Sequence, residues 1–292
     1  MAQKIELLIR AAESVVTGNN PFKDYIFPLI SGGFSSIMGA GVAYCTVWYQ
    51  ERIQIYKKNI DACNRILLSA DEAISELISL KHNYHGKLSN NPFQRATAIP
   101  YIVFSSKPIS VNLPDISFIV PQMGNSNNSI YKWSQIPRIR NMFNNYNFLI
   151  DAWNKRNEIY HPILEKIRRN TQTEKSPESN DRSRLITNDD VYEVIDISEF
   201  ARLIDLTETV IKLTDIIIAE LNDFLINFPD MIDKMIITKR KKHHASIFRF
   251  INENNKREEI IKHSLEVDFT ILSNLLEEPV DSIKNRYNAG YE

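Results

Sequence analysis

The chain has 292 residues, enough for one large domain or two small ones with a sizeable core. Its 35 Lys and Arg residues balance 36 Asp and Glu residues, and the formal net charge is -1. This balance excludes a general attraction to nucleic acid or anionic lipid, so a site for either must be local. Cys45 and Cys63 cannot form a disulfide framework, and we therefore expect a reducing compartment for most of the chain.

Residues 1–24 are amphipathic. Within them, the string KIELLIRAAESVV places apolar and polar residues at helical spacing, which is typical of a helix lying flat at a membrane interface. We predict an N-terminal arm here. Because this arm precedes the apolar stretch, a cleaved signal peptide is not expected.

Residues 25–50 carry no charged side chain. About 20 apolar residues of helix cross a hydrocarbon layer of ~30 Å, so this stretch is long enough to span a membrane. Tyr25 and Phe27 lie at one end, and Tyr44, Trp48 and Tyr49 lie at the other, as in interfacial aromatic belts. We predict a transmembrane helix. A buried core helix of a soluble protein is the alternative, because glycines and serines dilute the hydrophobicity.

Residues 51–90 are predicted to continue the same helix, because no Gly or Pro lies between Gly41 and Gly86. The slight excess of basic residues after the span favours a cytoplasmic body from residue 51 onward. A three-four repeat of apolar residues is typical of a coiled coil or of a helix packed on other helices of the same chain. Its members are Ile53, Tyr56, Ile60, Cys63, Leu67, Ala70, Ile74 and Leu77.

The same repeat, continued backward into the span, reaches small residues. Gly32, Ser35, Gly39 and Val42 lie on this face. Small residues let helices approach closely in lipid, so we predict a membrane-assembly face and a homo-oligomer.

Two further long helices are predicted at 131–169 and 197–228. The second contains several carboxylates, which exclude a second membrane span, and we expect Pro229 to end it. Residues 91–130 contain five prolines and predict an irregular insertion with short strands or turns. The sequence thus predicts a mainly α fold: one transmembrane helix continuing into a long cytosolic helix, packed in a bundle with this Pro-rich insertion.

The bundle is expected to occupy residues 131–292. Within it, residues 170–190 are polar and rich in Ser, Asn and Asp, which predicts a mobile loop. The C-terminal string IIKHSLEVDFTILSNLLEEPVDSIKNRYN predicts two short helices with a turn at Pro279.

The string Arg156-Asn157-Glu158-Ile159-Tyr160-His161 carries candidate chemistry. An imidazole can act on a ribose hydroxyl while a guanidinium stabilises phosphate charge. The string resembles the RNxxxH motif of HEPN domains, all-helical bundles that include metal-independent RNases. The resemblance implies catalytic roles for Arg156, Asn157 and His161. A structural role on a helix face is the alternative.

A basic block follows the Pro229 break. Lys239, Arg240, Lys241 and Lys242 precede His243 and His244, and such a block can hold the phosphates of anionic lipid or of nucleic acid. We predict an anionic-partner patch at residues 239–242, with nucleic acid the less favoured partner. A solvated loop is the alternative. No metal site and no cofactor are predicted, because the sequence has neither metal-ligand spacing nor a phosphate-binding glycine motif.

The order of arm, glycine-rich span, rod, insertion and bundle resembles single-pass, membrane-anchored bacterial proteins of phage-defence systems such as retrons and abortive-infection modules. The resemblance implies an effector at the inner membrane, with the bilayer and an operon-encoded protein as partners. It implies that partners hold the effector inactive and that, on infection, it rearranges or oligomerises and so damages the bilayer or a cytosolic target. A membrane-tethered scaffold and a HEPN-like endoribonuclease are the alternative functions.

Overall fold

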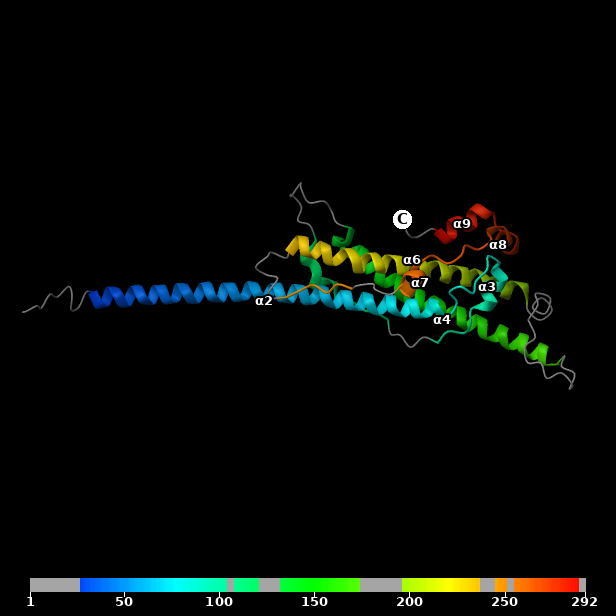
Figure 1. Ribbon diagram of the computed structural model, residues 1–292, viewed down its shortest axis with the longest axis horizontal. Helices are drawn as coiled ribbons and strands as arrows, with labels where there is room; N and C mark the ends of the chain where they lie inside the picture. The colour runs from blue at the N-terminus through cyan, green and yellow to red at the C-terminus, as the bar shows by residue number, and fades with distance from the viewer. Residues whose placement is uncertain are drawn as a thin grey trace, which may run out of the picture. The chain divides into compact units, whose positions relative to one another are not determined.

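The computed structural model describes residues 27–103, 108–120, 132–173, 196–236, 245–250 and 255–288. Over these residues the regular structure is helical, and no strand is present (Figure 1). The chain divides into two compact units, Met1–Lys58 and Asn59–Glu292. The predicted mainly α fold is confirmed for the part of the chain described. The predicted arm, residues 1–24, and the first two residues of the predicted span lie outside it.

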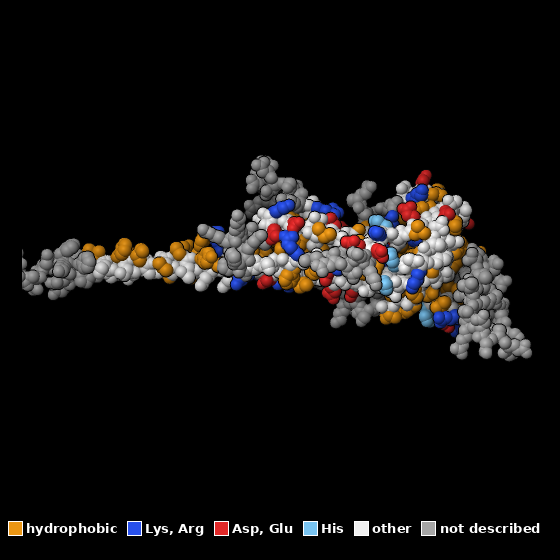
Figure 2. All heavy atoms as spheres, viewed as in Figure 1, with side chains coloured by type: hydrophobic (Ala, Val, Ile, Leu, Met, Phe, Trp, Pro, Cys, Tyr) orange, Lys and Arg blue, Asp and Glu red, His pale blue; other side chains and the backbone are white. Residues whose placement is uncertain are grey.

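Helix α2 (Phe27–His82) contributes to both units. In the first unit every residue from Leu29 to Arg52 is exposed, and Figure 2 shows hydrophobic side chains along this part of the helix. Water-soluble proteins rarely expose a continuous apolar surface of this length. The hydroxyl of Thr46 donates to the carbonyl of Val42 at 2.8 Å, so this polar group is satisfied within the helix, as lipid requires. One helix of the described residues is therefore long and apolar enough to cross a membrane.

In the second unit α2 contributes to the core. The predicted repeat from Ile60 to Leu77 is completely buried within the chain: Ile60, Cys63, Leu67, Ala70, Ile74 and Leu77 each have 0% exposure. These residues pack on other helices of the same chain, which was one of the two structures that the repeat predicted. A coiled coil between chains is not needed to explain them.

Helices α4 (Ile136–Thr173) and α6 (Ile197–Ile236) lie side by side and form much of this unit (Figure 1). Their predicted apolar repeats are buried, from Ile139 to Ile167 in α4 and from Phe200 to Phe228 in α6. The first four residues of the predicted loop 170–190 are the end of α4, and the remaining residues of that loop lie outside the described ranges.

The prediction that Pro229 ends the second helix is wrong, because α6 continues through it to Ile236. Proline removes one backbone donor and crowds the preceding turn, at a cost of about 3 kcal/mol. Met231 and Ile232, at 3% and 0% exposure, lie in the turns after the proline. Their burial stabilises the helix end and offsets that cost. Pro162 lies within α4 in the same way.

The Pro-rich insertion contains short helices where we expected strands or turns. Helix α3 spans Pro92–Ala98, and the 3-10 helix η2 spans Leu113–Ile119. A second 3-10 helix, η3 (Lys132–Ser134), lies at the start of the helix predicted over 131–169, and α4 begins after it at Ile136. Asn91 explains the start of α3: its side-chain oxygen accepts from the backbone N–H groups of Phe93 and Gln94. Pro92 follows at the first helical position, which tolerates it. The described part of the insertion contains no strand, and both of its short helices have a proline in their first turn, a position that tolerates it.

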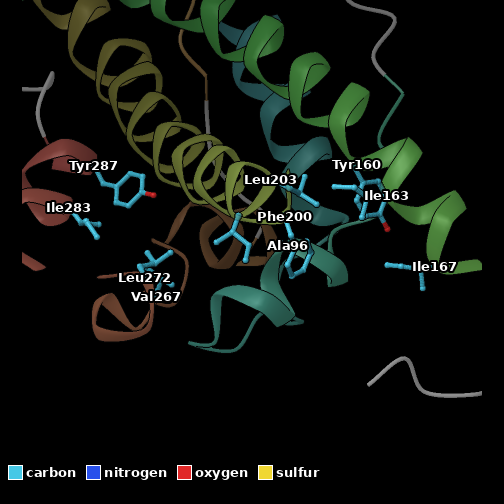
Figure 3. Packing of buried hydrophobic residues seen from close by; sticks show 11 residues of the cluster. Ala96, Tyr160, Ile163, Ile167, Phe200, Leu203, Val267, Leu272, Ile283 and Tyr287 are labelled. Atoms are coloured by element: carbon cyan, nitrogen blue, oxygen red, sulfur yellow. The ribbon is translucent and has the colours of Figure 1, made fainter. Parts of the chain in front are cut away.

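Short helices α7 (Asn255–Ile261), α8 (Phe269–Leu276) and α9 (Val280–Asn288) complete the unit. The two helices predicted around Pro279 are confirmed as α8 and α9. Figure 3 shows their side chains together with those of α3, α4 and α6 in one cluster of buried residues. Its members include Ala96, Tyr160, Ile163, Ile167, Phe200, Leu203, Ile204, Leu272, Ile283 and Tyr287.

The packing of α2 predicts different reactivities for its two thiols. Burial raises the pKa of Cys63 to about 12, whereas Cys45 is exposed. Thiols react as thiolates, so at pH 8 we expect Cys63 in the folded Cys45→Ser chain to resist a maleimide. It should react fully once the protein is unfolded in urea. Mass spectrometry of the alkylated chain measures both states, and rapid labelling of the folded variant would contradict this packing.

Candidate functional site

The predicted membrane-assembly face lies on the exposed part of α2. Gly32, Ser35, Gly39 and Val42 are all exposed, and at about 100° per residue they fall within about 80° of the helix circumference. A Cβ atom added at Gly32 or Gly39 would meet nothing within 4 Å. Within the described part of the chain, therefore, no contact requires a glycine at either position.

Arg156, the first residue of the HEPN-like string, is buried in the second unit. It has 0% exposure, and its guanidinium donates to the carbonyls of Ala96, Ile99 and Pro100 at 2.9, 2.7 and 3.1 Å. The carbonyls at the end of a helix have no partner within that helix. Arg156 satisfies that of Ala96 in the last turn of α3, and also those of Ile99 and Pro100 just after the helix. Burial lowers the pKa of Arg156 to about 10, so the side chain remains cationic at neutral pH.

Asn157 holds the chain that follows α3. Its side-chain Nδ2 donates to the carbonyl of Ile102 at 2.6 Å, and its Oδ1 accepts from the N–H of Ile102 at 3.5 Å. Ten residues earlier in α4, the side chain of Asn147 makes the same pair of hydrogen bonds to the backbone of Ile109, both at 2.9 Å. Each amide acts on a peptide group as a neighbouring strand would. We call Arg156, Asn157 and Asn147 the insertion clamp.

His161 has different surroundings. It is exposed, and its ring meets the ring of Tyr101 edge-on with centroids 6.0 Å apart. The structure therefore places an imidazole at the surface and the neighbouring guanidinium in the interior. In this arrangement Arg156 has no surface to offer a substrate, since its side chain is covered and bonded to backbone.

Two buried ion pairs were not predicted from the sequence. Lys81 of α2 lies 2.6 Å from Asp215 of α6, and Arg95 of α3 lies 2.8 Å from Glu208 of α6. Burial raises the pKa of Glu208, and the charge of Arg95 opposes this effect. Glu208 and Asp215 are seven residues apart and directly follow Thr207 and Thr214 of the apolar repeat. Carboxylates at this spacing beside a buried repeat were the signal that could have indicated buried partners.

A cavity of about 220 Å³ lies beside these pairs. Its lining includes Arg95, Glu208 and Asp215 together with Leu265, Phe269 and Tyr287. The Arg95 guanidinium donates through Nε to Glu208 and through Nη1 to the carbonyls of Ser89 and Leu265. Arg95, Glu208 and Asp215 of the cavity wall are thus engaged in ion pairs and with backbone, which is the pattern of a structural network.

The predicted anionic-partner patch, Lys239, Arg240, Lys241 and Lys242, lies outside the described residues. Among the residues that are described, no group of three or more His, Cys, Asp and Glu side chains is arranged to hold a metal ion. Comparison of the chain with protein-family models, curated proteins and solved structures finds no match.

Proposed function

We propose that this chain is a single-pass membrane protein that assembles through the membrane-assembly face and acts on the bilayer, as a toxin-type effector does. The supporting observation is the uninterrupted exposure of α2 from Leu29 to Arg52, which includes large apolar side chains such as Phe34 and Ile37. Removing such a surface from water stabilises a helix at about 25 cal/mol per Å². Lipid and neighbouring copies are the surroundings that remove it.

The open glycines support assembly. In lipid there is no hydrophobic drive between helices, so association depends on close packing, and small residues permit it. Gly32 and Gly39 are seven residues apart on one face, with Ser35 between them, and a Cβ atom added at either glycine would meet no described residue within 4 Å. A second copy of the helix can approach this face closely.

The proposed setting is the bacterial inner membrane, with the body in the cytoplasm and an operon-encoded protein as the regulator. Its support is the resemblance in organisation to anchored phage-defence proteins, together with the excess of basic residues after the span. The second unit, with its own buried core, is proposed to restrain or release assembly of the span.

Gly39→Leu tests this function, with Gly41→Leu as its matched control. Both glycines have open space around them, but position 41 is about 200° away from position 39 around the helix. We expect induction of the wild-type chain to depolarise cells and arrest growth. Gly39→Leu should abolish both effects, whereas Gly41→Leu should retain them, because only the first places a bulky side chain on the membrane-assembly face. A potential-sensitive dye measures depolarisation, and carbonate extraction confirms insertion.

Other results of that experiment support other functions. If the inserted wild-type chain is harmless, the scaffold alternative is favoured. If cellular RNA is cleaved and His161→Ala abolishes the cleavage, the endoribonuclease alternative is favoured. If carbonate releases the wild-type chain from the membrane fraction, the proposed span is wrong.

A further inference from the structure

Three cations follow the exposed apolar part of α2. Arg52, Lys57 and Lys58 are exposed, and they lie within eight residues of Gln50, the last residue of the uncharged stretch. At about 100° per residue, Lys57 and Lys58 are about 140° and 240° around the helix from Arg52. The charges therefore surround the helix instead of forming a stripe along it. We call Arg52, Lys57 and Lys58 the cation collar.

The cation collar lies at the depth of lipid headgroups if residues 29–50 cross the hydrocarbon. With a rise of about 1.5 Å per residue, it extends from about 3 to 12 Å beyond Gln50. The headgroup region of a leaflet is about 5–7 Å thick, and flexible lysine and arginine side chains reach several Å farther. Tyr44, Trp48 and Tyr49 directly precede the collar, at the level that interfacial aromatic residues occupy.

The charges of the cation collar are available to an outside partner. Among the described residues, none of the three cations forms an ion pair, and Glu51 is the single carboxylate in the segment 51–58. The guanidinium of Arg52 lies 4.2 Å from the centre of the Trp48 ring. This cation–π contact holds Arg52 against the interfacial ring, and its N–H groups donate to no acceptor among the residues that the structure describes.

We propose that the cation collar binds the phosphate groups of anionic phospholipids in the leaflet at the C-terminal end of the span. This inference rests on the proposed membrane span. Phosphates on all sides of a helix match cations on all sides, and each cation near an anionic surface strengthens binding by a factor on the order of five. The collar fixes the depth of the helix and places its C-terminal end at the more anionic leaflet, which is the cytoplasmic one.

The test uses the full chain in native nanodiscs cut from bacterial membranes with a styrene–maleic acid copolymer. The ratio of phosphatidylglycerol to phosphatidylethanolamine around the protein is compared with that of the bulk membrane. The wild-type chain should be enriched in phosphatidylglycerol by about threefold or more. Arg52→Gln, Lys57→Gln and Lys58→Gln, made together, should return the ratio to the bulk value.

A matched triple variant controls for total charge. Arg140→Gln, Arg202→Gln and Lys262→Gln remove three exposed cations of the second unit, and this chain should keep the enrichment. A wash in inorganic phosphate should remove no more bound lipid than a wash in chloride of equal ionic strength. The inference would be overturned if the variant without the collar kept the enrichment, or if the control variant lost it to the same extent. Displacement of the bound lipid by inorganic phosphate would also overturn it. Extraction of the wild-type chain by carbonate would instead overturn the proposed span.

Discussion

Replacing Lys81 by methionine is expected to lower the free energy of unfolding of the second unit by about 3–5 kcal/mol. The Nζ of Lys81 lies 2.6 Å from Asp215 and donates to the carbonyl of Lys262 at 2.5 Å, with no exposed surface on the side chain. The substitution leaves the Asp215 carboxylate buried without its cation. The backbone N–H and hydroxyl of Ser264 remain as its donors, at 2.6 and 3.2 Å, and do not replace a positive charge.

Two further variants isolate the cause of this loss. Lys81→Met combined with Asp215→Leu removes both charges, and we expect it to recover most of the stability, because an apolar pair can replace a buried ion pair. Lys155→Met breaks the exposed pair with Glu158 and should change stability by about 0.5 kcal/mol or less. Urea unfolding of the full chain in micelles, followed by fluorescence of the buried Trp133 and Trp153, measures all three. A Lys81→Met chain as stable as the control would show that the pair contributes little.

Replacing Arg156 by alanine is expected to have the second large effect, lowering the free energy of unfolding by about 3–4 kcal/mol. The change leaves the carbonyls of Ala96, Ile99 and Pro100 without their donor and opens space beside Tyr160, whose ring lies 4.3 Å from the guanidinium carbon. Arg156→Lys should recover only part of the loss, because one ammonium cannot reproduce the fork of the guanidinium. His161→Ala should change stability by about 0.5 kcal/mol or less, since that side chain is exposed.

The same variants distinguish a clamp from a catalytic group. If Arg156 acts as part of the insertion clamp, Arg156→Ala should make the region around residue 100 sensitive to limited proteolysis, and Arg156→Lys should restore part of its protection. If Arg156 is instead a catalytic group, Arg156→Ala should lower RNA cleavage without changing the stability of the chain or its sensitivity to proteolysis. An Arg156→Ala chain that unfolds at the wild-type urea concentration would argue against the clamp.

The helices could be predicted because each buries one face. The three-four repeats of α2, α4 and α6 record that geometry directly, and the residues they selected from Ile60 to Leu77 are completely buried. The membrane-assembly face at Gly32 and Gly39 stays a prediction, because these residues are exposed and no burial within the described residues tests it. Pro229 was misjudged because the cost of a proline is local, whereas the burial of Ile232 that offsets it depends on the tertiary fold.

The insertion clamp could not be predicted from spacing. Arg156 and Asn157 lie in a polar part of α4, where charged and amide residues are ordinarily solvated. Their partners, from Ala96 to Ile102, lie more than 50 residues earlier in an insertion without periodicity. A similar limit applies to Lys81 and Asp215. The spacing of Glu208 and Asp215 beside the buried repeat indicates buried carboxylates, but it does not indicate which cations pair with them, because those cations lie on other helices.

During synthesis of this chain, the two parts of α2 reach their final surroundings at different times. The apolar residues from Leu29 onward leave the ribosome first and can enter a bilayer at once, whereas the buried repeat from Ile60 waits for later helices. Glu76 bonds to Tyr146, Lys81 pairs with Asp215, and Asn64 bonds to the carbonyl of Ser246. At about 5–20 residues per second, the roughly 150 residues between the ends of α2 and α6 take about 8–30 s to appear. During that interval the apolar repeat is uncovered, and in the proposed membrane setting we expect a chaperone to bind the nascent chain there.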